Sequence, residues 1–380
     1  MALRSTKPVI LIVHPSSGWG GAERTSVNIV KICREYHFPA LLLSNQIRFR
    51  NSAGDNLYLD RNFQSWFGKT KRILNDLLRL YRLCRSLRPR IIIGMMPYGG
   101  FLASVITKFL PFECKSIASP RGSCKYFLKY FVKPSLEKAK YKFFFSLACG
   151  LADYFLSPSM ASIKDYVSYF HVNLSKCFHI PNAVEVPKLN YDYLFDRRLS
   201  TFDSPELVWL GRFSEEKRLD LILESIKRLN CEKASLYMAG EDCAVKFRLK
   251  RIARDYGISD RIIFFGYQED VYSFLMPRHI FVHACLFEEF GYALLEAMSV
   301  GLPVVSMDCP YGPREILDNG KYGILVKDYN EMASAIDSIA ADKDFWLLLA
   351  NRARERVRHY DFWTVGRCYY EMFSTISENF

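Results

Sequence analysis

The feature that most constrains this chain is a repeated alternation of short apolar runs with longer amphipathic stretches. A first set of runs occupies 9–13, 40–43, 91–94, 116–119 and 154–156. A second set occupies 207–210, 235–239, 261–265, 280–282, 303–307 and 324–326. Such runs, bounded by Gly or Pro, are typical of buried parallel strands whose connecting helices cover both faces of a sheet. The pattern predicts an α/β protein with two Rossmann-like domains facing each other across a cleft.

The length of the chain agrees with two domains, because its 380 residues suffice for two hydrophobic cores at roughly 150 residues per domain. We expect an N-terminal domain over 1–185 and a C-terminal domain over 200–361, with a hinge near 183–203. The segment 362–380 carries apolar residues at helical spacing. Because such a stripe must cover another surface, this helix is expected to pack back on the first domain.

Cysteine usage and hydropathy predict a cytoplasmic protein. The eleven Cys residues are scattered without a CxxC pair, so we expect reduced thiols and no metal framework. The apolar run at 9–13 is too short for a secretory signal. The longest uncharged stretch, 91–107, contains Pro97 and falls short of a membrane span, so it is expected to be a buried strand, a loop and a helix.

The positive charge, a net +12 at pH 7, is concentrated in the expected first domain. Between 115 and 142, eight Lys or Arg residues oppose only Glu137, and aromatic residues are interleaved with them. A second basic run lies within 61–90. This pattern predicts peripheral contact with an anionic membrane surface, at the inner face. A solvated basic face and a nucleic-acid surface are the alternatives, but no recognised nucleic-acid module is present, so no nucleic acid is expected.

Three segments after predicted strands carry candidate chemistry. A glycine-rich turn contains Gly20 and Gly21, and it either brings backbone N–H groups to a phosphate or makes a tight turn. Arg212 and Lys217 follow the first strand of the second set, at the edge where such sheets bind ligands. These two cations suit a diphosphate; solvated loop charges are the alternative.

The third segment contains Glu288, Gly291 and Glu296. We expect Glu288 just before a helix that contains Glu296, so the two carboxylates are too far apart to share a proton. They can instead hold hydroxyl groups at opposite ends of one elongated ligand, which Gly291 lets the backbone approach. A ligand with hydroxyls at each end and phosphates between is a nucleotide sugar. The alternatives are a helix-terminal charge for Glu288 and a surface position for Glu296.

Together these motifs resemble those of the retaining glycosyltransferases of family four, which have the two-domain GT-B fold. The resemblance rests on Gly-Gly-Ala-Glu-Arg at 20–24, Gly-Arg-Phe-Ser-Glu-Glu-Lys at 211–217, the Glu288/Glu296 pair, and Gly-Leu-Pro-Val-Val at 301–305. The segment 308–317 is similar to the variant in members that build bacterial glycans and commonly use UDP-sugars. The resemblance covers nearly the whole chain.

The resemblance implies roles for the site residues. Arg212 and Lys217 would grip the diphosphate, Glu288 the donor sugar and Glu296 the ribose, with Arg212, Lys217 and Glu288 assigned as catalytic. The remaining donor-binding residues would be Gly20, Gly21, Tyr267, Phe290, Gly291 and Tyr292. Tyr267 lies where the family binds the base, although a packed loop aromatic is an equal alternative.

The sequence departs from the family pattern at two places. Glu289 replaces the usual Gly, which leaves the identity of the donor sugar open. Arg121 stands in the segment where many members carry a His near the reacting sugar; it would contact an anionic acceptor or the donor, with a structural salt bridge as the alternative. No metal is expected, because the Arg/Lys pair and a helix dipole would neutralise the leaving diphosphate.

The resemblance therefore implies a retaining, metal-independent hexosyltransferase without a cofactor apart from its UDP-sugar donor. The expected reaction moves a hexose or N-acetylhexosamine to a growing, lipid-linked surface glycan, such as a lipopolysaccharide, capsule or oligosaccharide precursor. A GDP-sugar (mannosyl-type) transferase and a catalytically silent nucleotide-sugar or glycan-binding protein are the alternatives. The intact Arg212, Lys217, Glu288 and Glu296 argue against the silent protein.

Overall fold

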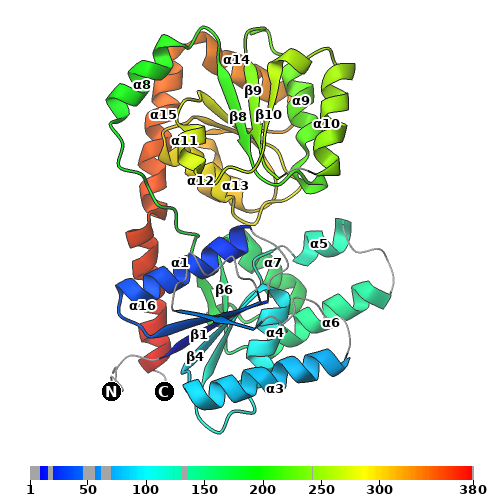
Figure 1. The fold of residues 1–380 in the computed structure, drawn as a ribbon, viewed down its shortest axis with the longest axis vertical. Coiled ribbons are helices and arrows are strands. Elements are labelled where there is room, and N and C mark those ends of the chain that lie inside the picture. Colours follow the sequence, from blue (N-terminus) through cyan, green and yellow to red (C-terminus); the bar gives the residue numbers. More distant parts are fainter. Residues whose placement is uncertain are drawn as a thin grey trace. The chain divides into compact units, whose positions relative to one another are not determined.

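The structure is a computed structural model that divides into two compact units. The described residues are 9–15, 20–45, 56–60, 70–122, 124–130, 136–241 and 243–378. The first unit comprises 1–183 together with 363–380, and the second comprises 184–362. Each unit is built around its own parallel sheet, drawn in Figure 1. The predicted α/β class with two Rossmann-like halves is therefore confirmed.

The first unit contains a sheet with the strand order β3-β2-β1-β4-β5-β6-β7 among the described residues. Its strands are β1 (Ile10–His14), β2 (Ala40–Ser44), β3 (Leu57–Leu59), β4 (Ile91–Met95), β5 (Lys115–Ser119), β6 (Tyr154–Ser157) and β7 (Cys177–His179). The central strands β1 and β4 are buried along their whole length, as apolar runs covered by helices on both faces should be. The sequence analysis missed β3 and β7, the two short edge strands.

Helices cover this sheet on both faces (Figure 1). They are α1 (Gly21–Glu35), α3 (Thr70–Leu87), α4 (Met96–Ile106), α5 (Cys124–Tyr130), α6 (Leu136–Leu151), α7 (Met160–Phe170) and α16 (Phe362–Glu378). Although α16 ends the chain, it lies beside α1. Its Phe373 ring packs edge-on against Phe38 at 5.4 Å, and its Tyr370 ring lies 5.3 Å from that of Tyr36. Aromatic contacts of this kind anchor α16 in the first unit.

The second unit contains a parallel sheet with the order β10-β9-β8-β11-β12-β13 among the described residues. Its strands are β8 (Glu206–Leu210), β9 (Ser235–Ala239), β10 (Ile262–Phe265), β11 (Ile280–His283), β12 (Val304–Met307) and β13 (Ile324–Val326). All six coincide with the second set of apolar runs to within a residue. The order reverses between β8 and β11, which places a topological switch point, and thus a ligand-binding edge, at the carboxyl ends of these strands.

The helices of the second unit are α8 (Tyr191–Ser200), α9 (Leu219–Lys227), α10 (Ala244–Asp255), α11 (Val271–Leu275), α12 (Tyr292–Ser299), α13 (Gly312–Ile316), α14 (Tyr329–Ala341) and α15 (Lys343–Val357). The core includes Trp209 and Trp346, both at most 1% exposed. The Trp346 indole N–H donates to the carbonyl of His279 at 2.7 Å, so this buried polar group is satisfied.

The boundary between the two units lies at 183/184, at the start of the segment 183–203 that was predicted as a hinge. The rest of that segment contains α8, which packs in the second unit. The Phe195 ring of α8 meets Trp346 edge-on at 5.4 Å. The Arg198 guanidinium is buried and donates to the carbonyls of Met276 and Val300, each at 2.9 Å. Buried Arg residues are rare, and the charged residues of α8 hide its apolar face from a hydropathy pattern. For this reason the sequence shows no helical pattern in this segment, and a hinge was predicted there.

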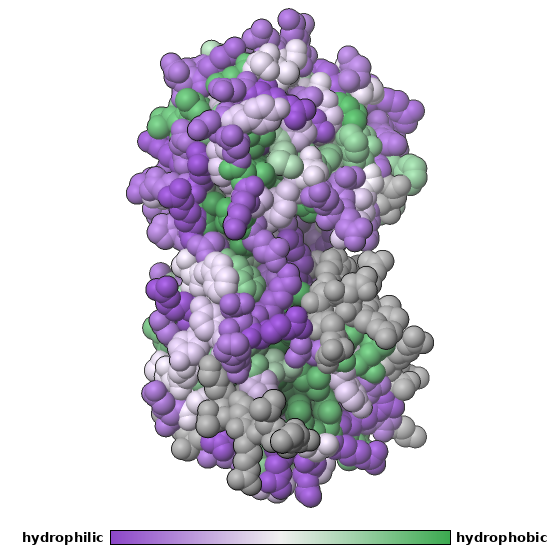
Figure 2. Space-filling view, turned by 60° about the vertical axis from the view of Figure 1, so that its left-hand side comes forward, coloured by the Kyte–Doolittle hydropathy of each residue, from purple (hydrophilic) through white to green (hydrophobic). Residues whose placement is uncertain are grey.

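The hydropathy of the described residues gives no helix long and apolar enough to cross a membrane. The stretch 91–107 forms β4 and α4, as a buried strand and a helix, with no loop between them. On the face shown in Figure 2, hydrophobic residues form small areas among hydrophilic ones.

Candidate active site

Lys217 and Glu288 are brought together by two loops at the carboxyl edge of the second sheet. Lys217 ends a 3-10 turn, η4 (Glu215–Lys217), shortly after β8. The Leu286 N–H donates to the Glu216 carbonyl at 2.7 Å, which ties the loop after β11 to this turn. On its other side, the Gly312 N–H donates to the Glu288 carbonyl at 2.8 Å. The backbone thus fixes Glu288 between its two neighbouring loops.

The Lys217 ammonium donates a hydrogen bond to Oε2 of Glu288 and forms an ion pair with it. The two side chains are only 19% and 20% exposed. Burial alone would raise the pKa of the Glu288 carboxyl, but the Lys217 charge and His283 outweigh it and hold that pKa well below its usual range. Burial opposes the charge of Lys217 as well, yet Glu288 raises the pKa of Lys217. Both groups are therefore charged at neutral pH.

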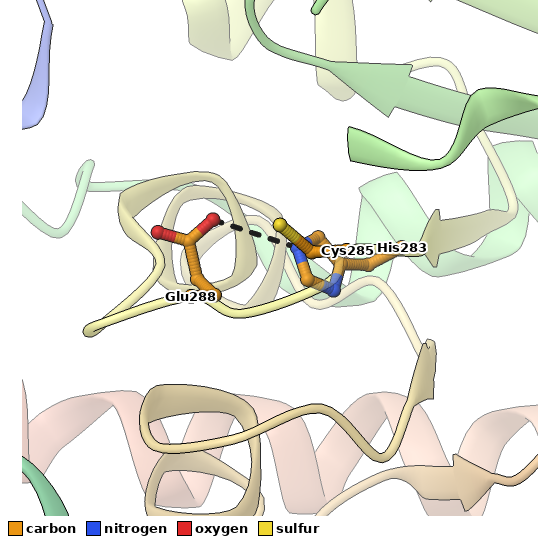
Figure 3. A group of neighbouring side chains, drawn as sticks. All are labelled: His283, Cys285 and Glu288. Carbon is orange, nitrogen blue, oxygen red and sulfur yellow. Dashed lines mark ion pairs between the residues drawn. The ribbon is translucent and has the colours of Figure 1, made fainter. Parts of the chain in front are cut away.

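His283 and Cys285 complete this cluster, as Figure 3 shows. His283 ends β11, and its Nε2 atom lies 3.7 Å from Oε2 of Glu288. Its Nδ1 atom lies 2.9 Å from the hydroxyl of Ser306, which orients the ring. Burial lowers the pKa of His283, an effect that Glu288 offsets only in part. The imidazole is thus neutral at pH 7.

The sequence analysis missed both His283 and Cys285. The available signal was a polar residue at the last position of an apolar strand, five residues before Glu288. Such a position points to the ligand-binding edge of a parallel sheet.

The loop that carries Glu288 continues directly into α12. Gly291 caps this helix with φ of +110°, a left-handed conformation that favours glycine. A Cβ atom on Gly312 would lie 1.8 Å from the Phe290 carbonyl, so only glycine permits the loops to approach this closely. Phe290 and Tyr292 are buried. Their side chains support the loop, and only their backbone N–H groups at the start of α12 remain suited to an anion.

Glu296, Arg212 and Tyr267 differ in exposure. Glu296 lies within α12 and is 2% exposed, so a surface position is excluded. The Arg212 side chain is 72% exposed, 3.7 Å from Glu216, and does not join the Lys217–Glu288 pair. Tyr267 is 57% exposed, which rules out the packed loop aromatic. The structure therefore brings together Lys217 and Glu288, and leaves the Arg212 and Tyr267 side chains open to solvent.

In the first unit, the glycine-rich turn leads into α1. Gly20 is the N-cap residue and Gly21 begins the helix; Ser16, Ser17, Gly18 and Trp19 lie outside the described residues. His14, at the end of β1, places Nδ1 2.5 Å from the Ser26 hydroxyl and Nε2 3.4 Å from Oε1 of Glu23. A glycine at the N-cap is compatible with either a phosphate contact or a simple turn.

Arg121 makes hydrogen bonds to neutral groups of the first unit. Its guanidinium donates to Oδ1 of Asn182 at 2.8 Å and to the Tyr369 hydroxyl at 3.1 Å. Arg121 has φ of +50°, a conformation that is strained for a residue other than glycine. If Arg121 does not contact a ligand, its role is structural: its hydrogen bonds link the end of β5 to Asn182 and to α16. These bonds replace the salt bridge that was the alternative predicted from the sequence.

The basic run of the first unit lies on α5 and α6. Lys129 and Lys142 lie over the rings of Tyr130 and Tyr169, at 5.1 and 4.9 Å, and Phe143 is 61% exposed. Lys133 lies outside the described residues, as do the side chains of Lys138 and Lys140. The second unit carries further basic residues on α10, around the exposed ring of Phe247, a surface that the sequence analysis missed.

Comparison with known proteins identifies the second unit. Residues 195–359, nearly all of that unit, match the family model described as group 1 glycosyl transferases. The second unit therefore carries the sequence pattern of the group 1 glycosyl transferases. The matched region contains Arg212, Lys217, Glu288 and Glu296, so the family match includes every candidate side chain of the carboxyl edge.

One of two curated relatives extends the likeness to both units. The chain is 22% identical over 357 residues to the N-acetylgalactosamine-N,N'-diacetylbacillosaminyl-diphospho-undecaprenol 4-alpha-N-acetylgalactosaminyltransferase of Campylobacter jejuni, covering 91% of the chain and 94% of the relative. It is 34% identical over 155 residues to the lipopolysaccharide core biosynthesis glycosyltransferase LpsE of Rhizobium meliloti, covering 40% of the chain and 44% of that relative.

A solved structure shows the same fold. Anabaena Alr3699/HepE, crystallised with UDP and glucose, superimposes with a TM-score of 0.79 at 16% identity, over 97% of this chain and all of the other. At this identity the likeness concerns the fold alone. The predicted resemblance to GT-B glycosyltransferases is thus confirmed.

Proposed function

We propose that the chain is a retaining glycosyltransferase that moves a hexose or N-acetylhexosamine from a UDP-sugar to a growing, lipid-linked glycan. The observation that carries the proposal is the largely buried Lys217–Glu288 pair at the carboxyl edge of the second sheet. A buried ammonium next to a carboxylate offers one group for a phosphate and one for hydroxyls. A diphosphate-linked sugar carries both of these groups, the phosphates and the hydroxyls, close together.

In the proposed donor complex, Lys217 moves from Glu288 to the diphosphate, and Glu288 accepts hydrogen bonds from the sugar hydroxyls. The start of α12, at Gly291 and Tyr292, presents backbone N–H groups to the distal phosphate. Glu296 holds the ribose, and the solvent-exposed Arg212 closes over the diphosphate. The positive charge of Lys217 and Arg212 stabilises the departing UDP, so transfer proceeds without a metal.

The proposed acceptor rests on what the relatives do. One relative acts on an undecaprenol-linked diphosphate sugar, and another takes part in lipopolysaccharide core biosynthesis. A lipid-linked glycan of bacterial type is therefore the proposed acceptor. The basic and aromatic surface on α5 and α6 would hold the enzyme at an anionic membrane, with its substrate in reach.

A donor assay tests this function. The purified protein is incubated with UDP-glucose, UDP-galactose, their N-acetylated forms or GDP-mannose, and release of the nucleoside diphosphate is followed with and without a lipid-linked acceptor. UDP release from one of the UDP-sugars, unaffected by EDTA, is the expected result. Release from GDP-mannose alone would instead establish the mannosyl-type reaction. Binding without release from any donor would establish a silent binding protein.

A further inference from the structure

We propose that His283, Cys285 and Glu288 form an inhibitory binding site for a borderline or soft divalent cation such as Zn²⁺, and that this cation competes with Lys217 for Glu288. The binding site stands on the cluster itself. Only its inhibitory consequence rests on the proposed function.

The three side chains offer one nitrogen, one sulfur and one oxygen ligand. The ligand atoms of His283, Cys285 and Glu288 all lie within 4.8 Å of one another, and Figure 3 shows them converging beside the loop that follows β11. Zn²⁺ binds such atoms at about 2.0–2.3 Å, which places two ligands of one tetrahedral ion about 3.3–3.8 Å apart. Small side-chain rotations therefore suffice to close this group around an ion.

His283 gives independent support for a ligand. The residue is 3% exposed. Among the described residues its Nε2 atom has no hydrogen-bond partner, and Oε2 of Glu288, a proposed ligand of the same ion, lies 3.7 Å away. A buried polar atom without a partner costs free energy, so the site favours any ligand that satisfies it. The contact of Nδ1 with Ser306 holds the ring in place. Metal-binding imidazoles use the same arrangement, in which the second nitrogen is fixed by a hydrogen bond.

Cys285 supplies the selectivity for borderline and soft cations. Its thiol is buried and lies 2.8 Å from the Phe287 carbonyl, to which it donates. Binding therefore replaces the S–H bond with a sulfur–metal bond and releases one proton to solvent. Hard cations such as Mg²⁺ gain little from a thiolate, whereas Zn²⁺, Co²⁺ and Cd²⁺ gain much.

Lys217 makes the site inhibitory. Its ammonium is ion-paired with the Glu288 carboxylate, so a metal ion that binds Glu288 must displace the Lys217 ammonium. A displaced Lys217 and a metal-bound Glu288 are no longer arranged for a donor. The same competition implies that removal of the ammonium strengthens metal binding, because Glu288 then lacks its counter-ion.

Co²⁺ provides a spectroscopic probe on the full-length protein, without any donor. We expect a thiolate-to-cobalt absorption band in the near ultraviolet that saturates with Co²⁺, increases from pH 6.5 to 8, and disappears on Zn²⁺ addition. Cys285→Ser should abolish the band, and His283→Gln should weaken Co²⁺ binding at least about tenfold. Lys217→Met should tighten it, and Mg²⁺ should leave it unchanged.

The proposal is overturned if wild-type protein shows no such band, or if Cys285→Ser retains it, since another of the cysteines then binds the ion. A Lys217→Met variant that binds Co²⁺ no more tightly than wild type would overturn the competition. In the transfer assay, Zn²⁺ should inhibit the wild type, and Cys285→Ser should lose a smaller fraction of its own metal-free rate. The spectra do not require turnover, so a protein without transferase activity would defeat the proposed function and leave the metal site standing.

Discussion

The two units each carry a Ser–His–Glu arrangement at the carboxyl end of a buried strand, and they differ in what surrounds the carboxylate. In the first unit, His14 lies between Ser26 and Glu23. In the second, His283 lies between Ser306 and Glu288 at similar distances. Glu23 belongs to the first turn of α1, where the helix dipole stabilises it. Glu288 precedes its helix and is paired with Lys217 instead.

This difference teaches where a ligand can act. A helix dipole is fixed, so it stabilises Glu23 permanently. A lysine ammonium on a four-carbon stem can leave its partner and follow a phosphate. In the second unit this mobile charge makes the arrangement of three side chains a candidate for binding and catalysis.

The largest expected effect that distinguishes the second unit from the first is the loss of glycosyl transfer when the Lys217 side chain is removed. Lys217→Ala should lower kcat/KM by about 10²–10³-fold, because one positive charge on the departing diphosphate contributes about 3–4 kcal/mol. The donor assay on purified protein measures this loss. Lys227→Ala, a change on the surface of α9, is the matched control and should retain wild-type activity. Near-normal turnover in Lys217→Ala would remove the diphosphate assignment.

A second test compares the two glutamates by stability. Glu288→Gln leaves the Lys217 ammonium largely buried without its counter-ion, a change that costs about 3 kcal/mol. Glu23→Gln removes a charge beside a helix terminus, which costs about 0.3–1 kcal/mol. Thermal unfolding followed by circular dichroism should therefore show a clearly lower Tm for Glu288→Gln. Equal shifts in both variants would mean that the two carboxylates have the same role.

The pH dependence of stability sharpens the comparison for His283. Because burial lowers its pKa in the fold, the unfolded chain binds a proton near pH 6.5 that the folded chain rejects. The contribution of His283 to the free energy of unfolding is thus fully present above the pKa that this residue has in the unfolded chain. It is lost as the pH falls below that value. His279, with a pKa also lowered by burial, adds to this slope. Between pH 7 and 5, the Tm of the His283→Gln variant should fall less than the Tm of the wild type. An equal fall in both proteins would contradict the lowered pKa of His283.

The smallest expected effect concerns the basic surface of the first unit. The double variant Lys125→Gln/Lys129→Gln should bind anionic vesicles about 30-fold more weakly in a co-sedimentation assay, since each Lys near such a surface contributes about 1 kcal/mol. Neutral vesicles should bind neither protein, and added salt should reduce the wild-type binding. Equal binding to neutral and anionic vesicles would reject an electrostatic contact. The pair Lys250→Gln and Arg251→Gln on α10, both exposed, tests whether the second unit contributes.

Features of the fold and the site could be predicted from the sequence where they depend on neighbouring residues, and could not where they depend on residues far apart in the chain. The central strands were predictable because burial on both faces demands continuous apolar runs, whereas the three-residue edge strands β3 and β7 carry too little signal. Lys217 and Glu288 were each found from their positions after strands. Their direct pairing could not be predicted, because it depends on a backbone hydrogen bond between Leu286 and Glu216, which are seventy positions apart in the chain.

His283 and Cys285 escaped for a related reason. Each has an ordinary place in a sequence, a polar end of a strand and an isolated cysteine. Their meaning arises only when the loop after β11 folds Glu288 back beside them. Likewise, Arg121 resembled a ligand-binding position, and only the fold revealed its bonds to Asn182 and Tyr369.

The central claim is that Lys217 and Glu288 form a preassembled pair that opens to bind a nucleoside diphosphate. Isothermal titration of UDP into wild-type protein and into Lys217→Ala tests this claim most directly. The account predicts saturable UDP binding to the wild type, stronger than that of uridine, and at least about tenfold weaker binding to the variant. Equal affinities of the two proteins for UDP, or no binding of UDP to the wild type, would contradict it.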